Sequence, residues 1–113
     1  MFEALRDLLR PYAAMMVVVT DAPGYYYLDT HHVIENKKPL FFAAAQTGKW
    51  YVSYYLMPVY VFPDLLDGLP AALKKRMQGK SCFNFTSLDD DALAALHDLT
   101  KRGFERYQSG GLP

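Results

Sequence analysis

Apolar residues near the start of the chain recur at the spacing of one helix face. They are Phe2, Leu5, Leu8 and Leu9. This spacing predicts a short helix over residues 2–10, ended near Pro11. The same spacing runs from Leu88 to Tyr107 and predicts a long closing helix. We expect Ser87 to cap that helix, with residues 89–91, all aspartates, in a first turn where the helix dipole favours carboxylates.

Between these helices, apolar and β-branched residues form short runs bounded by turn residues, as strands do. The predicted strands are residues 15–20, which we expect to be buried, and residues 25–28, 40–45, 50–56 and 81–85. Alternation within residues 50–56 places Trp50 and Tyr54 on one face, and Phe83 and Phe85 share a face of the last strand. The short connections favour antiparallel neighbours.

The segment between the fourth and fifth strands carries helix signals. Residues 63–67 fit one helical turn closed by Gly68, and a helix is predicted from Pro70 to Met77 with Gly79 just past its end. The resulting order, α-β-β-β-β-α-β-α, predicts an α+β domain with a five-stranded, mainly antiparallel sheet and flanking helices. We expect residues 81–85 to be an inner strand, residues 1–108 to form a single domain and residues 109–113 to be a frayed tail.

Composition narrows the functional classes. Of the 113 residues, 51% are hydrophobic and 21% charged, which indicates a folded domain. Twelve Lys and Arg balance twelve Asp and Glu, so we expect no nucleic-acid partner. The sequence shows neither a targeting signal nor an apolar stretch of membrane-span length. We therefore expect a cytoplasmic protein that has no membrane partner and keeps Cys82 reduced.

No cluster of reactive residues predicts catalysis or metal binding. The Gly79–Ser81 segment lacks the glycine spacing and the strand-to-helix context of a phosphate-binding loop. The His31–Glu35 segment is interpreted as a polar loop rather than a metal site. Adjacent residues of a strand point to opposite faces, so His31 and His32 cannot easily bind the same metal ion. Cys82 lies in an apolar run without a neighbouring base and is interpreted as a buried hydrophobe. We expect no catalytic residues, metal site or cofactor.

One combination of residues predicts a site. Helices can cover one face of an antiparallel sheet and leave the other partly open, and an open aromatic face is often a binding surface. Trp50, Tyr54 and Lys80 are therefore hypothesised to border a cleft for a small anionic or aromatic molecule, or for a second copy of the chain. The alternative is that Trp50 and Tyr54 are ordinary core residues.

The C-terminal half also resembles a known family. The resemblance is carried by the strand at residues 49–55, the basic helix at 73–77, the Gly79–Phe85 segment and a closing helix from Leu88, and it covers about residues 37–107. These features resemble the YdhG-like domain family of small bacterial proteins, largely of unknown function. The resemblance implies an α+β fold with an antiparallel sheet and flanking helices. Some relatives are described as frataxin-like iron handlers.

The expected function is therefore a non-enzymatic binding module for a small anionic or aromatic ligand or for a protein partner, including self-association. The alternative is a frataxin-like iron or metal chaperone. A binding module should show a cleft with aromatic walls and Lys80 at its mouth, whereas a chaperone should show clustered carboxylates on one surface.

Overall fold

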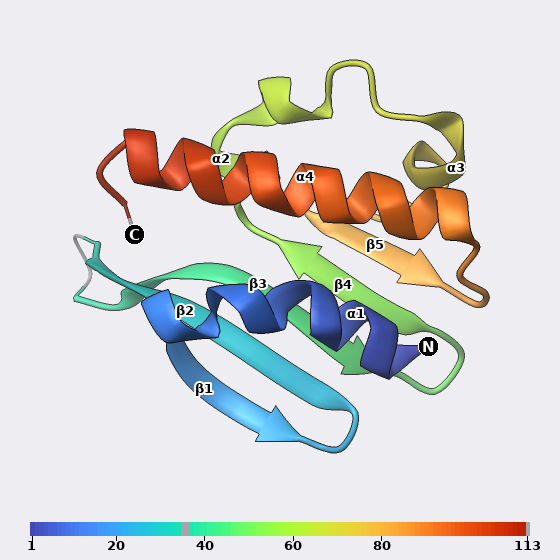
Figure 1. Ribbon diagram of the computed structural model, residues 1–113, viewed down its shortest axis with the longest axis horizontal. Coiled ribbons are helices and arrows are strands. Elements are labelled where there is room, and N and C mark those ends of the chain that lie inside the picture. The colour runs from blue at the N-terminus through green and yellow to red at the C-terminus, as the bar shows by residue number, and fades with distance from the viewer. Residues whose placement is uncertain (35–36, 113) are drawn as a thin grey trace.

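The computed structural model describes residues 1–34 and 37–112. Its elements, in chain order, are α1 (Phe2–Leu9), the 3-10 helix η1 (Arg10–Met15), β1 (Val17–Ala22), β2 (Tyr25–Val33), β3 (Pro39–Thr47), β4 (Val52–Leu56), α2 (Pro58–Val61), the 3-10 helix η2 (Pro63–Leu66), α3 (Ala71–Lys74), β5 (Cys82–Phe85) and α4 (Asp90–Ser109). The α+β class and the helices near both ends are as predicted (Figure 1).

The five strands form one antiparallel sheet in the order β1-β2-β3-β4-β5, so each strand pairs with its neighbour in sequence. The prediction that β1 is buried is wrong. Val17, Val18 and Val19 are each at least 40% exposed, because β1 is an edge strand that pairs on one side only. Residues 81–85 are likewise not an inner strand, since β5 ends the sheet.

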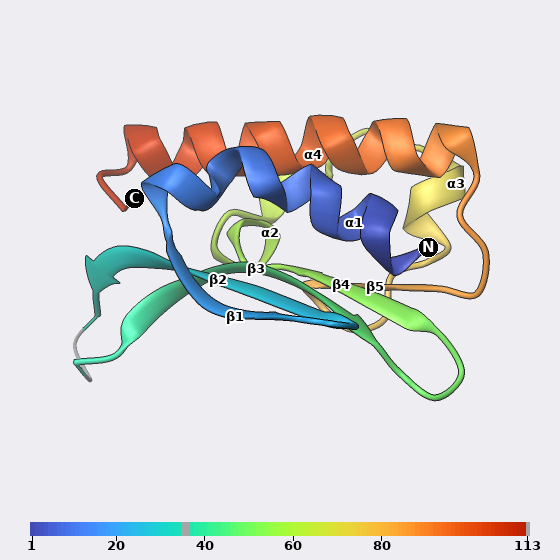
Figure 2. The ribbon, with the colours of Figure 1, turned by 60° about the horizontal axis from the view of Figure 1, so that its bottom comes forward.

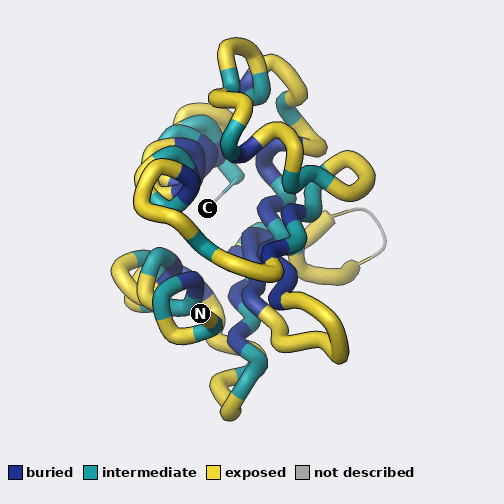
Figure 3. The backbone as a smooth tube through the Cα atoms, turned by 90° about the vertical axis from the view of Figure 1, so that its right-hand side faces the viewer, coloured by how far each residue is buried: buried dark blue, intermediate teal, exposed yellow. Residues whose placement is uncertain are grey.

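All the helices lie on the same face of the sheet (Figure 2). The core forms where α1 and α4 meet that face, and the buried parts of the chain gather there (Figure 3). Phe83 and Phe85 are fully buried on this side, as the alternation predicts. Phe42 reaches Tyr107 of α4 at a ring-centroid distance of 6.0 Å. The opposite face of the sheet carries no other element of the described chain.

The helix predicted over residues 70–77 is shorter than expected. α3 ends at Lys74, after which the backbone turns back to pair with β5. The Asn84 N–H donates to the Arg76 carbonyl at 2.9 Å, the Gln78 N–H donates to the Cys82 carbonyl at 2.8 Å, and Met77 forms a bridge with Phe83. This segment covers part of the outer edge of β5, and strand pairing thus overrides the local helix signal.

Both ends of α4 differ from the predictions. The N-cap is Asp89 rather than Ser87, and its carboxylate accepts the Ala92 N–H at 2.7 Å. Residues 109–112 do not form a frayed tail. The Gly111 N–H donates to the Gln108 carbonyl at 3.1 Å, and the Leu112 N–H donates to the Tyr107 carbonyl at 2.8 Å. These bonds form a Schellman motif that returns Leu112 to the core. Pro113 lies outside the described residues.

Replacing Gly111 by alanine is expected to lower the free energy of unfolding by about 1 kcal/mol, since its φ of +72° is one that a Cβ disfavours. Asparagine, which tolerates this conformation, should cost less. Chemical denaturation measures the loss. The matched control is alanine at Gln108, which is exposed on the same last turn. Equal stability of the Gly111→Ala variant and the unmodified protein would contradict the motif.

Candidate ligand-binding pocket

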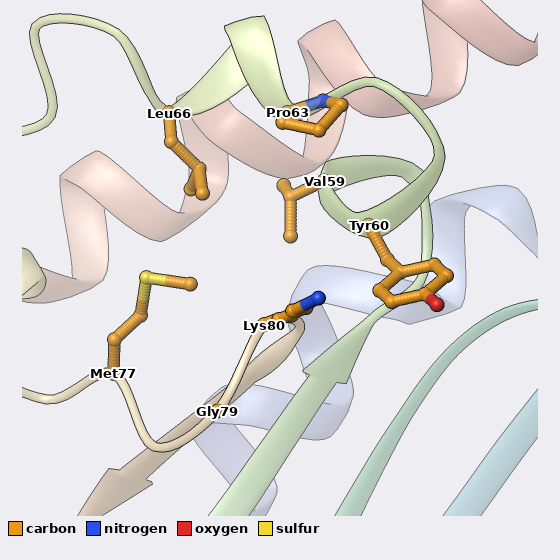
Figure 4. Close-up of a pocket in the computed structure, with 7 residues that line it drawn as sticks. All are labelled: Val59, Tyr60, Pro63, Leu66, Met77, Gly79 and Lys80. Carbon is orange, nitrogen blue, oxygen red and sulfur yellow. The ribbon is translucent and has the colours of Figure 1, made fainter.

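A pocket of about 560 Å³ lies between the segment that follows β4 and the turn that precedes β5 (Figure 4). Its lining residues are Val59, Tyr60, Pro63, Leu66, Met77, Gly79 and Lys80. The first four come from α2 and η2, and the last three come from the turn. Two stretches that are remote in sequence therefore make one concave surface.

Prolines and a glycine build this pocket locally. Pro58 and Pro63 occupy first helical positions of α2 and η2, where their missing N–H costs nothing. Gly79 adopts a φ of +81° in the turn between Gln78 and Cys82, and this turn presents Lys80. The Leu56 N–H donates to the Ser81 carbonyl at 2.8 Å. That bond fixes the turn beside the end of β4, next to α2.

The pocket combines apolar walls with a cation at its rim. Val59 is buried, and Leu66 and Met77 are half-buried. The Lys80 ammonium lies 5.9 Å from the centre of the Tyr60 ring, and both side chains are exposed. Within the described chain, Lys80 makes no ion pair. Its charge is therefore free to meet an anionic group.

The acidic side chain on the neighbouring η2 is already engaged. Asp64 accepts two hydrogen bonds from the Arg106 guanidinium of α4, at 2.8 and 2.9 Å. These bonds lower the pKa of the Asp64 carboxyl below its usual value. Asp64 is consequently held as the partner of Arg106 rather than as a counter-ion for Lys80.

The structure does not bring Trp50, Tyr54 and Lys80 together, so their predicted common cleft is wrong. Tyr54 is fully buried beneath α4, where its hydroxyl lies 2.6 Å from that of Thr100. Trp50 precedes β4 rather than lying in it, and it is 76% exposed. Val52 pairs with Phe85, whereas Leu56 meets Ser81. Trp50 and Lys80 therefore lie at opposite ends of β4, which at 3.3–3.4 Å per residue is about 17 Å long.

Of the three predicted residues, Lys80 alone lines the pocket. Sequence reasoning missed Val59, Tyr60, Pro63 and Leu66, because α2 and η2 are too short for a periodic pattern. Met77 ends the helix predicted over residues 70–77, whereas the structure places it after α3, in a bridge with Phe83. The available signal was the repeated proline around an aromatic and apolar run, which indicates a tight and non-repetitive chain path.

The other candidate residues lie apart from this pocket. His31 and His32 belong to β2 rather than to a loop, and Glu35 falls outside the described residues. Within residues 1–34 and 37–112, no group of three or more His, Cys, Asp or Glu side chains could hold a metal ion. Cys82 is half-buried rather than fully buried; its thiol donates to Asn84 at 3.3 Å, and burial raises its pKa. That shift disfavours a reactive thiolate.

Among the described residues, no helix has the length and apolar character to cross a membrane. No family model matches the chain, and no curated protein or solved structure does. The likeness to YdhG-like domains stays a prediction from the residues that carry it.

Proposed function

We propose that this protein is a non-enzymatic binding module whose pocket takes a small molecule with an apolar body and one anionic group. The observation that carries this proposal is the Lys80 ammonium, which makes no ion pair with any described residue and lies beside the Tyr60 ring at the rim of an apolar pocket. The apolar body would lie against Val59, Leu66 and Met77. The anionic group would stay at the rim, where Lys80 meets it without losing all its hydration.

The size and chemistry of the pocket support a ligand rather than a reaction. Its volume of about 560 Å³ lies within the range typical of small-molecule sites. Lys80 and Tyr60 are its polar side chains, and a hydrolytic or transfer reaction needs a nucleophile, a base and a stabilising group that converge. A carboxylate is the anion that we expect, because one ammonium suffices to neutralise it.

Octanoate and 3-phenylpropionate, titrated into the isotopically labelled protein and followed by NMR, test this proposal. We expect amide shifts to gather at residues 59–66 and 77–80 and to be absent from Trp50. The matched alcohols, octanol and 3-phenylpropanol, should bind more weakly because they lack the charge. Shifts that gather around Trp50 instead would place the ligand outside this pocket.

Replacing Lys80 by glutamine is expected to weaken binding of octanoate about tenfold, which is the loss of one charge-assisted hydrogen bond. Arginine at position 80 should preserve most of the affinity. Lys101→Gln is the control, since it removes an exposed cation on α4 that does not line the pocket. Unchanged affinity in Lys80→Gln, measured by NMR titration, would contradict the proposal.

A further inference from the structure

The helix-free face of the sheet carries a cluster of aromatic rings around a small hollow. Tyr25, Tyr27, Phe41 and Tyr55 line a hollow of about 170 Å³ together with Ala44 and Gln46. All four rings are half-buried. The Tyr27 and Phe41 rings stack at a centroid distance of 4.7 Å, and Tyr25 meets Tyr27 edge-on at 6.1 Å.

Strand register explains why the hollow forms. Ala44 pairs with Tyr27 on one side and with Tyr55 on the other, so a methyl group stands between two aromatic walls. On the Tyr55 side, the Ser53 hydroxyl donates to the Asn84 side-chain oxygen at 2.7 Å and joins β4 to β5. The volume is comparable to that of a cavity which holds one benzene molecule, about 150 Å³. The hollow thus has room for one compact group.

One carboxylate, that of Asp29, lies on this face next to the aromatic rings. Asp29 shares the face with Tyr27 and is the register partner of Phe41. In the described part of the chain its carboxylate has no ion-pair partner, and no Lys, Arg or His lines the hollow. Partial burial raises the pKa of Asp29 above its usual value.

We propose that this hollow binds an organic cation of the quaternary or methylated ammonium class. Aromatic faces carry negative electrostatic potential and attract such cations, and the ring set with Asp29 beside it complements a positive charge. A phosphate-bearing ligand would be repelled by the same carboxylate. The site is separate from the Lys80 pocket, shares no residue with it and prefers the opposite charge.

Choline and its neutral carbon isostere 3,3-dimethyl-1-butanol test the proposal, because they differ in charge and hardly in shape. We expect saturable NMR shifts with choline at residues 25–27, 41–46 and 55. The isostere should bind about tenfold more weakly, as expected when a cation–π contribution is removed. Equal binding of the two probes, no saturation up to high millimolar choline, or shifts confined to other residues would each overturn the proposal.

Substitutions separate this hollow from the first pocket. Ala44→Leu should fill the hollow and abolish choline binding, while Tyr27→Leu and Asp29→Asn should each weaken it severalfold. Because Tyr27 and Asp29 are only half-buried, we expect both of their variants to fold. They therefore still test the proposal if Ala44→Leu fails to fold. Tyr60→Leu is the matched control and should leave choline binding unchanged. Full choline affinity in both Tyr27→Leu and Asp29→Asn would overturn the assignment.

Discussion

Replacing Phe83 by alanine is expected to lower the free energy of unfolding by about 3–5 kcal/mol, the cost of removing a fully buried ring and leaving a cavity. Phe83 is 0% exposed and belongs to the core cluster on the helix side of the sheet. It pairs with Tyr54 on β4 and bridges to Met77 on the other side. Its neighbours are therefore fixed on both sides and cannot collapse easily into the space. Chemical denaturation gives the measurement.

Trp50→Ala is the matched control for this loss. The indole of Trp50 is larger than the ring of Phe83, yet it is 76% exposed. Its removal should change stability by about 0.5 kcal/mol or less. A loss below about 1 kcal/mol in Phe83→Ala would mean that the site relaxes around the missing ring and that the strand contributes little to the core.

Replacing Thr100 by valine is expected to cost about 1–3 kcal/mol, because it leaves the Tyr54 hydroxyl buried without a partner. The two hydroxyl oxygens lie 2.6 Å apart, and both residues are at most 1% exposed. Burial raises the pKa of Tyr54 well above its usual value, so the hydroxyl keeps its proton at neutral pH. Urea denaturation of the Thr100→Val variant measures the cost.

A double-mutant cycle isolates this interaction. Tyr54→Phe should cost less than Thr100→Val, since a helical threonine can still donate to the carbonyl one turn earlier. The variant that combines both changes has no unpaired hydroxyl and should be more stable than the sum of the single losses predicts. Additive losses would show that the two hydroxyl groups do not stabilise each other.

Local signals predicted the sheet well, because its strands pair with their neighbours in sequence. Turn residues such as those before Tyr25 end one strand and begin the next, and alternation placed Phe83 and Phe85 correctly. The same signals predicted burial wrongly where the position of a strand depends on the pairing of residues that are distant in sequence. The valines of β1 look like a buried strand, yet β1 occupies an edge, and that position depends on the whole sheet order.

The candidate site was harder to predict than the fold. The alternating pattern predicts a strand that begins two residues before β4, so it places Trp50 in the strand, whereas Trp50 lies in the bend that precedes β4. The Tyr54 ring packs in the core. Composition alone cannot distinguish an aromatic side chain of the core from one that binds a ligand. The pocket brings residues 59–66 to residues 77–80 through the Leu56–Ser81 hydrogen bond. Lys80 lines this pocket, although the sequence places it beside Trp50 and Tyr54 rather than beside α2 and η2.

The order of elements has a consequence for how the chain acquires its structure during synthesis. The strand pairs of the meander join neighbours in sequence, so they can form soon after each strand emerges from the ribosome. The side chains on the helix side of β4 and β5 become covered only when α4 packs on them, and α4 follows every strand in the chain. Until its 20 residues have emerged, Phe42, Tyr54 and Phe83 lack much of their cover. Until α4 packs onto it, the nascent sheet therefore exposes an apolar face, which favours aggregation.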